Sequence, residues 1–283
     1  MTPTLVQSQL PRAGAPPRVD RCARARDWAE IQERMLVPLV EAVYERLEVG
    51  RGTRLLDLGC GSGLALLMAA ARGAAVTGVE PSAPERLALA RERLLPDPAA
   101  APRGTRLVEG APEAATALDA PEYTLVTAFQ PIGCATGDAE ELSALLESAA
   151  PLAEHGAAVV LAGWGPPERC ATSSVLRVAT KLADPLRHPR GWRPACRDDL
   201  EEVAQRAGLK PDGSGRVACP FGYADMDSAV RGLLSTGLFD AAVGATDQEQ
   251  VDKELTEALH PHQRRDGTVW MPNVFRYLIA RTR

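Results

Sequence analysis

The chain has 283 residues, which is long enough for one large α/β domain with additional elements that close over it. Its formal net charge is −5 and no run of basic residues offers a footprint for a phosphate backbone, so the sequence argues against nucleic acid as a substrate. Six cysteines are scattered without a C-x-x-C pair, which indicates reduced thiols rather than a zinc site or a disulfide framework. The start lacks a signal-peptide core and no apolar run is long enough to cross a bilayer, so we expect a cytoplasmic protein without membrane contact.

The N-terminal part of the chain divides into a tail and a helical region. Residues 1–18 are rich in proline, glutamine, threonine and small residues, which cannot bury enough apolar surface to offset the entropy of ordering. We therefore expect a disordered tail, followed by a single domain over 19–283. From Trp28 to Leu47 apolar residues recur every three or four positions, which predicts amphipathic helices that are divided at Pro38.

The stretch from about 50 to 165 alternates between strand and helix patterns. Residues 53–58 (TRLLDL) are an apolar run of strand length, and a glycine-rich loop and a helix separate them from a second strand at 75–80. The same alternation predicts helices at 84–94 and 139–154 and strands at 106–109, 123–129 and 157–164. The sequence therefore predicts a doubly wound α/β core over this stretch.

Beyond residue 165 the pattern is less regular. It predicts helices at 173–182, 197–207, 226–238 and 247–259, a strand around 216–220, and a last strand at 269–280 that is rich in aromatic and β-branched residues. We expect the segments outside the core to form a cap that carries substrate elements, at about 19–48, 166–195 and 222–265.

One loop carries the sharpest signal in the sequence. Residues 57–63 (DLGCGSG) place an acid at a strand end before three glycines at alternate positions. Glycines here let a ligand approach backbone that a Cβ would block. The dinucleotide fingerprint G-x-G-x-x-G is not met, because Leu64 stands at its last position. The loop therefore argues against a nicotinamide dehydrogenase.

A second acid supports a ligand at this loop. Glu80 ends the second predicted strand, 21 residues after Gly59, where a carboxylate can accept hydrogen bonds from both hydroxyls of a ribose. A ligand with a ribose, cationic groups and no phosphate, as S-adenosylmethionine has, suits this carboxylate and that of Asp57. A glycine-rich turn alone is also typical of simple turn chemistry. The combination of Asp57, Gly63 and Glu80 favours a cofactor site.

These motifs resemble a known family. LLDLGCGSG followed by VTGVEPS is similar to the first two motifs of the class I S-adenosylmethionine-dependent methyltransferases. YTLVTAF followed by Gln130, then VVLAGWGPPE and a terminal VFRYLIA, resemble more loosely the small-molecule branch common in actinomycetes. The resemblance implies a Rossmann-like sheet of seven strands with N-terminal helices and a helical cap inserted near the C-terminus.

The resemblance also implies which residues bind the cofactor: Trp28, Asp57, Gly59, Cys60, Gly61, Gly63, Glu80, Pro81, Ala111, Pro112 and Phe129. Trp28 matches an N-terminal aromatic that the family places over the cofactor, and helix packing is its alternative role. Ala111 stands where the family usually has an Asp for the adenine amino group. This departure leaves adenine recognition to the backbone at Ala111 and Pro112, or to Glu113.

The acceptor site is expected at the carboxyl ends of the strands, which points to Gln130, Ile132 and Trp164 as substrate-binding residues. No catalytic residue is identified by the sequence. A general base or hydroxyl-orienting group could come from His188, Tyr223 or His262, and a surface or packing role is the alternative for each. No metal is expected, because the histidine and acidic residues have no recognisable ligand spacing.

Three functions stay open on the sequence. The first is methyl transfer from S-adenosylmethionine, with S-adenosylhomocysteine as product, to a small molecule, in natural-product biosynthesis. The second is an S-adenosylmethionine-binding protein that catalyses a cyclisation or rearrangement without methylation, and the third is a non-catalytic binding protein. The acceptor atom and the choice between a monomer and a homodimer are not decided by the sequence.

Overall fold

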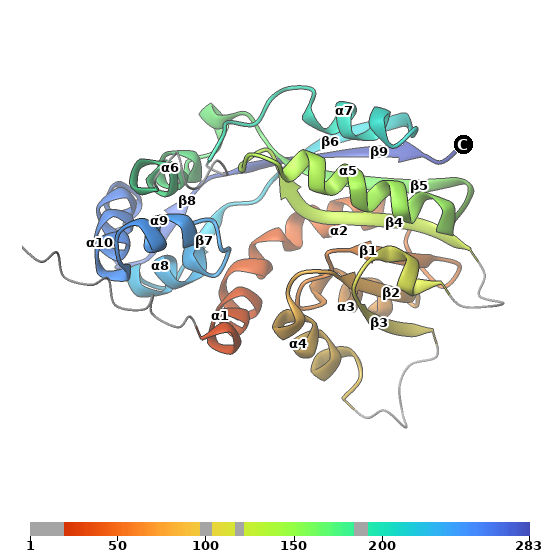
Figure 1. The fold of residues 1–283 in the computed structure, drawn as a ribbon, viewed down its shortest axis with the longest axis horizontal. Helices are drawn as coiled ribbons and strands as arrows, with labels where there is room; N and C mark the ends of the chain where they lie inside the picture. The colour runs from red at the N-terminus through yellow and green to blue at the C-terminus, as the bar shows by residue number, and fades with distance from the viewer. Residues whose placement is uncertain (1–19, 97–103, 117–121, 184–191) are drawn as a thin grey trace, which may run out of the picture.

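Seven strands form one sheet in the order β3-β2-β1-β4-β5-β9-β6 in the computed structural model, which describes residues 20–96, 104–116, 122–183 and 192–283 (Figure 1). Neighbours from β3 to β5 are parallel, and β9 runs antiparallel to both β5 and β6. The predicted Rossmann-like, doubly wound seven-stranded sheet is therefore confirmed. The predicted tail at 1–18 lies outside the described residues. The strand bounds are β1 Arg54–Leu58, β2 Ala75–Glu80, β3 Thr105–Glu109, β4 Tyr123–Ile132, β5 Ala153–Trp164, β6 Lys210–Ala218 and β9 Val274–Arg281.

Helices cover both faces of the sheet. One face carries α2 (Val37–Arg46), α3 (Leu64–Ala71) and α4 (Pro84–Leu94), and the other carries α5 (Asp138–Ala149) and α7 (Asp199–Arg206) (Figure 1). Successive strand residues point to opposite faces, so Leu55 packs in the first core and Leu56 in the second. Both leucines are fully buried, and burying each contributes about 1.5–3 kcal/mol to folding.

The N-terminal helices form one continuous helical run with an irregular centre. After α1 (Arg21–Asp27) the chain forms a π-helical turn at Trp28–Gln32 and a 3₁₀ turn at Glu33–Leu36 before α2 begins. Pro38 lies in the first turn of α2, where its missing N–H costs nothing, so the predicted division of the helices falls there. Local π-helical turns are frequent at functional sites. This irregular centre faces the glycine loop.

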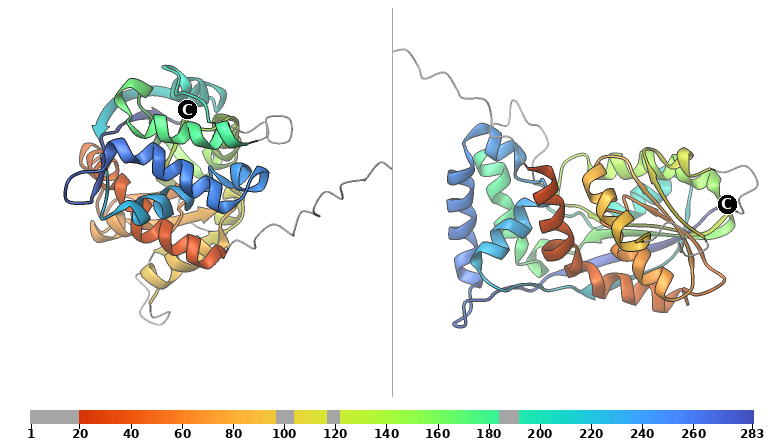
Figure 2. Two further views of the ribbon diagram at one scale, coloured as in Figure 1. Left: turned by 90° about the vertical axis from the view of Figure 1, so that its left-hand side faces the viewer. Right: turned by 90° about the horizontal axis from the view of Figure 1, so that it is seen from below.

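A second group of elements extends from the carboxyl ends of β5 and β6. We call it the helical cap: α6 (Thr172–Leu182), α8 (Met226–Leu234), α9 (Asp240–Ala245) and α10 (Gln248–Leu259), with the two-stranded sheet of β7 (Phe221–Tyr223) and β8 (Val269–Met271). The cap helices pack on one another, and α8 also contacts α1 and the π-helical turn. Figure 2 shows the cap at one end of the molecule and the large sheet at the other, with α1 between them.

The predicted last strand, 269–280, is wrong in one respect, because it is two strands. β8 ends at Met271 and β9 begins at Val274. Pro272 has no N–H for a ladder, and the Asn273 side chain turns inward to donate to Thr172 Oγ1 (2.9 Å) and to accept from the Thr172 N–H (3.2 Å). The break lets the chain leave the cap and enter the large sheet. In the described ranges, no helix is long and apolar enough to cross a membrane.

Candidate cofactor and active site

The glycine loop follows β1 and adopts a left-handed backbone at each of its three glycines. Gly59, Gly61 and Gly63 have φ of 67°, 56° and 83°, and the Gly59 and Cys60 N–H groups donate to the Val79 carbonyl (2.9 and 3.1 Å). The three glycines have different surroundings. A Cβ on Gly63 would lie 3.0 Å from that of Ala90 on α4, whereas a Cβ on Gly61 would lie 2.8 Å from Glu33 Oε1. Gly63 therefore serves helix packing, while Gly61 faces a pocket.

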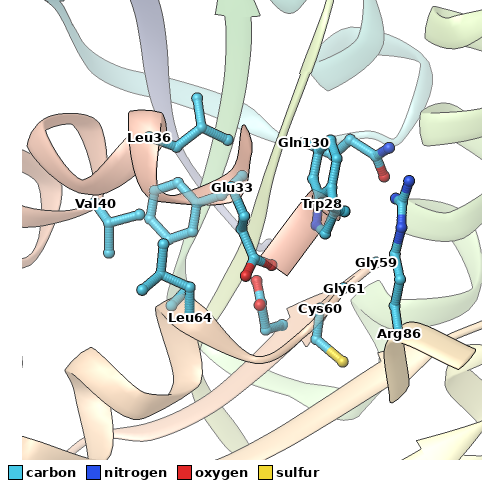
Figure 3. Close-up of a pocket in the computed structure, with 13 residues that line it drawn as sticks. Trp28, Glu33, Leu36, Val40, Gly59, Cys60, Gly61, Leu64, Arg86 and Gln130 are labelled. Carbon is cyan, nitrogen blue, oxygen red and sulfur yellow. The ribbon is translucent and has the colours of Figure 1, made fainter. Parts of the chain in front are cut away.

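This first pocket lies between the glycine loop and the N-terminal helices, and it has about 420 Å³ of unfilled space, part of it open to solvent. It brings together seven of the residues that the sequence predicts for cofactor or substrate (Trp28, Asp57, Gly59, Cys60, Gly61, Phe129 and Gln130). The other lining residues are Glu33, Leu36, Val40, Leu64, Ala65 and Arg86. Figure 3 shows Glu33 directed at the loop, with Trp28 beside it and Arg86 on the other side of the indole.

Glu33 is a buried acid that lies directly over the loop. Its Oε1 accepts from the Ser62 N–H (3.0 Å), its other oxygen accepts from the Ser62 hydroxyl, and Arg93 lies 3.7 Å away. Burial is the largest influence on the carboxyl group and raises the pKa of Glu33, while the hydrogen bonds from Ser62 and Trp28 and the charge of Arg93 oppose that increase. A cation in the pocket would favour the ionised form.

Asp57 is the second acid of this pocket, at the end of β1. It accepts a hydrogen bond from Thr127 Oγ1 (2.7 Å) on the neighbouring β4. The pKa of Asp57 is raised to about 7, mainly by burial and in addition by the nearby carboxyl groups of Glu33 and Glu80, while the Thr127 hydrogen bond lowers it. A positive charge in the pocket would therefore shift this group toward its carboxylate form at neutral pH.

Glu80 connects the glycine loop to the loop after β2. Its Oε2 accepts from the Gly61 N–H (3.0 Å), and its Oε1 accepts from the N–H groups of Ser82 (3.1 Å) and Ala83 (3.2 Å). A carboxylate oxygen can accept more than one hydrogen bond, so Oε2 keeps a lone pair for a ribose hydroxyl. Glu80 thus has a structural role in addition to the predicted one.

Trp28 and Arg86 form one wall of the first pocket, beside the glycine loop. The Arg86 guanidinium carbon lies 4.0 Å from the centre of the indole ring, and Arg86 Nη2 donates to the Ser235 carbonyl (2.7 Å) at the end of cap helix α8. The indole N–H is buried and has no hydrogen bond of normal geometry in the described part of the chain. A buried donor of this kind fits a ligand acceptor.

A second pocket meets the first at Gly59 and Gln130, which line both. It has about 830 Å³ of unfilled space, part of it open, and it reaches from Ser82 to the start of α5. Ile132, predicted to bind substrate, lines this pocket, and so does Leu238 of the segment between α8 and α9. The second pocket therefore joins the loop of the large sheet to the cap.

Six predicted binding residues do not line either pocket in the described structure: Gly63 and Glu80, whose contacts are given above, and Pro81, Ala111, Pro112 and Trp164. Pro81 and Ala111 are exposed, Pro112 begins a 3₁₀ turn (Pro112–Ala115), and Trp164 packs against Phe275 with ring centres 4.7 Å apart. Trp164 lies in an aromatic cluster that joins β5 to β7 and β9.

Of the candidate catalytic residues, Tyr223 and His262 line neither of the two pockets. Tyr223 is buried on β7 and donates to Gln32 Oε1 (2.9 Å), and burial raises its pKa well above the usual range, so it is a neutral hydroxyl. His262 lies in a 3₁₀ turn (His260–His262) after α10, and burial lowers its pKa. His188 lies outside the described residues. Within the described ranges, no group of three or more His, Cys, Asp or Glu side chains could hold a metal ion.

Sequence reasoning missed Glu33 and Arg86. Glu33 lies three residues before Leu36 and seven before Val40, so it is a charged side chain on the apolar face of the N-terminal helices. A charged side chain on an apolar helix face is the signal in the sequence that could have identified Glu33 as a site residue. Arg86 lies in the first half of α4 among alternating charged and apolar residues, and its sequence gives no comparable signal.

Comparison with known proteins agrees with this geometry. A family model described as a methyltransferase domain matches residues 56–160, and comparison with curated proteins gives no match. The BH2331 protein of Bacillus halodurans C-125 superposes with a TM-score of 0.53 at 14% identity, covering 86% of this chain and 98% of that one. YcgJ of Bacillus subtilis superposes with a TM-score of 0.51 at 15% identity, covering 89% of this chain and 99% of that one. The [4+2]-cyclase SpnF superposes with a TM-score of 0.50 at 15% identity, covering 86% of this chain and 80% of that one.

At these identities the solved structures establish the fold, and the family model establishes the domain within it. Residues 56–160 therefore form a methyltransferase domain within a chain that has the fold of the solved methyltransferases, and S-adenosylmethionine is the cofactor of this domain. The first pocket suits this molecule chemically. The acids Glu33 and Asp57 suit its cationic sulfonium and ammonium groups, and the buried Trp28 N–H suits its carboxylate.

Proposed function

We propose that this methyltransferase transfers the methyl group of S-adenosylmethionine to a small molecule held between the carboxyl edge of the sheet and the helical cap. The observation that carries the proposal is the meeting of the two pockets at Gly59 and Gln130, with Leu238 lining the second. A site that is covered by additional elements excludes water from a small ligand better than a site at an open sheet edge does. The resemblance of the sequence to the small-molecule branch supports an acceptor of the kind made in natural-product biosynthesis.

The proposed division of the chain follows from the same arrangement. The sheet and its loops at about 50–165 bind the cofactor, and the segments at about 19–48, 166–195 and 222–265 enclose the acceptor. The link from Arg86 to the Ser235 carbonyl supports this division, because it joins the wall of the first pocket to the cap. Trp28 contributes to the same wall from the N-terminal segment.

Methyl transfer requires the nucleophile, the methyl carbon and the leaving sulfur to be aligned. Bound S-adenosylmethionine supplies the electrophilic methyl group. The protein contributes position and desolvation, which can account for much of the rate without a dedicated base. Gln130, which lines both pockets, is suited to orient a polar acceptor group at their junction. No histidine lines either pocket in the part of the chain that the structure describes.

The experiment supplies methyl-deuterated S-adenosylmethionine with panels of small phenols, amines and carboxylic acids, and follows both products by mass spectrometry. We expect S-adenosylhomocysteine and a labelled methylated acceptor in equal amounts. A product isomeric with its acceptor, formed while the labelled cofactor stays intact, would instead support cyclisation or rearrangement. Binding without turnover on any acceptor would support a non-catalytic role.

A matched pair of variants tests the place of the acceptor. Leu238→Phe adds volume in the second pocket, while Leu234→Phe adds the same volume to a partly buried position at the end of α8 that lines neither pocket. We expect Leu238→Phe to raise the acceptor KM with little change in cofactor affinity, and Leu234→Phe to leave both in place. Equal effects of the two variants would argue against an acceptor in the second pocket.

A further inference from the structure

We propose that Glu33 recognises the α-ammonium group at the methionine end of the cofactor and thereby makes the pocket selective for ligands that carry this amine. The inference rests on the proposed use of S-adenosylmethionine and adds a residue from outside the matched domain, which begins at residue 56. Glu33 lies 28 residues before Gly61 in the sequence and reaches the loop only because the N-terminal helices pack against it.

The position of the carboxylate is the first argument. A Cβ on Gly61 would lie 2.8 Å from Glu33 Oε1, so the acid occupies the space that the missing side chain leaves free. Glu33 also lines the pocket that Gly59, Gly61 and Asp57 line. A ligand that approaches the glycine backbone must therefore meet the Glu33 carboxylate.

The orientation of the carboxylate is the second argument. Ser62 donates its N–H to one oxygen and its hydroxyl to the other, and Arg93 donates to Ser62 Oγ (2.8 Å) while lying 3.7 Å from Glu33. A carboxylate has about four acceptor positions, and the two Ser62 donors and the Trp28 indole leave at least one of them free. The acid is thus fixed before a ligand arrives, and its remaining lone pair can face an ammonium group without a further cost of side-chain ordering.

The surrounding groups define the ligand chemistry. Asp57 adds a second buried acid on the loop side, which favours a cation. The Trp28 indole N–H would lie 3.3 Å from a Cβ on Gly61, is about nine-tenths buried, and has no hydrogen bond of normal geometry among the described residues. The pKa of Glu33 is lowered by this indole N–H, so the donor already lies beside the acid, and the pair matches the carboxylate and ammonium groups of an amino acid. The structure therefore assigns the methionine end of the cofactor to this corner.

The test is calorimetric binding of three ligands that share the adenosine. S-adenosylhomocysteine has the amine but no sulfonium charge, its deaminated analogue lacks the amine, and 5′-methylthioadenosine lacks the whole amino-acid end. The proteins are the wild type, Glu33→Gln, and Glu92→Gln on the exposed face of α4 as a control. Thermal unfolding of each variant accompanies the titrations.

We expect the wild type to bind S-adenosylhomocysteine about 10 to 100 times more tightly than the deaminated analogue, the range for one charge-assisted hydrogen bond. Glu33→Gln should remove most of that preference, leave 5′-methylthioadenosine binding unchanged, and Glu92→Gln should change nothing. An unchanged or stronger affinity of Glu33→Gln for S-adenosylhomocysteine would overturn the inference. If Glu33→Gln does not fold, equal wild-type affinity for the first two ligands overturns it as well. Failure of the wild type to bind any of the three ligands would refute the cofactor assignment instead.

Discussion

The guanidinium group of Arg86 lies over the indole ring of Trp28, 4.0 Å from its centre, and the same guanidinium donates to the Ser235 carbonyl. Three parts of the chain meet in this contact: the N-terminal helices, the first half of α4 and the end of cap helix α8. None of these parts neighbours another in the sequence. The stack holds the Trp28 ring in the wall of the cofactor pocket, and a desolvated pair of this type is worth about 2 kcal/mol.

Replacing Arg86 with methionine keeps the apolar stem and removes both the charge and the hydrogen bond to Ser235. We expect cofactor affinity to fall about 3- to 30-fold, because the Trp28 ring loses its cation–π contact and the Ser235 carbonyl of the cap loses its hydrogen bond. Arg91→Met, at an exposed position of the same helix, is the control and should bind as the wild type does. Titration of S-adenosylhomocysteine measures the effect, and an Arg86→Met affinity equal to that of Arg91→Met would contradict this role.

Asp57 links cofactor binding to pH. Because burial raises its pKa from 3.8 to about 7, the fold favours the neutral acid, and its contribution to the free energy of unfolding is greatest at low pH and lost as the pH rises through about 7. A cationic ligand favours the carboxylate instead. S-adenosylmethionine affinity should therefore rise as the pH increases from about 6 to about 8, with proton release visible as a buffer-dependent binding enthalpy.

Asp57→Asn separates the two effects. The variant should unfold at a higher temperature than the wild type at pH values above the Asp57 pKa, since no buried charge forms, and it should bind S-adenosylmethionine about tenfold less tightly. Thermal scans and titrations over the same pH series check both. A wild type whose affinity is flat across the series would show that Asp57 does not titrate in the pocket.

Gly61 and Gly208 have similar left-handed backbones, with φ of 56° and 69°, but different surroundings. A Cβ on Gly61 would meet Glu33 and Trp28, whereas one on Gly208 would meet nothing within 4 Å. Each alanine variant should lose about 1–2 kcal/mol of unfolding free energy from backbone strain. Only Gly61→Ala should also weaken S-adenosylhomocysteine binding, by about tenfold or more. Similar binding by both variants would mean that the pocket does not extend over Gly61.

The sequence predicted the cofactor half of the fold well because its signals are local. The apolar runs at β1 and β2, the glycines between them and the pattern of α4 lie within a short stretch, and the predicted bounds of β2 and α4 match those of the structure. β6 shows the opposite case. It is an edge strand with a mostly exposed, polar sequence containing Pro211 and two glycines, so its hydrophobic signal is weak and the prediction found only its end.

The cap and the acid over the loop depend on contacts between distant segments. β7 has only three residues and forms by pairing with β8, about 50 residues later, which no local pattern predicts. The short helix α9 was also missed. Glu33 reaches Ser62 across 29 residues of sequence, and the amphipathic pattern of its helix indicates only that a face is buried. Which partner covers that face is decided by tertiary packing.

The central claim is that the cofactor lies across residues 59–63 with its ribose at Glu80, and titration of S-adenosylhomocysteine into the wild type, Glu80→Gln and Glu92→Gln tests it most directly. Glutamine keeps the shape and one acceptor but loses the charge-assisted bond, so we predict micromolar binding to the wild type and Glu92→Gln and about 10- to 100-fold weaker binding to Glu80→Gln. 5′-Methylthioadenosine should show the same loss, since it retains the ribose. Absence of binding to a folded wild type, or equal binding by all three proteins, would contradict the account.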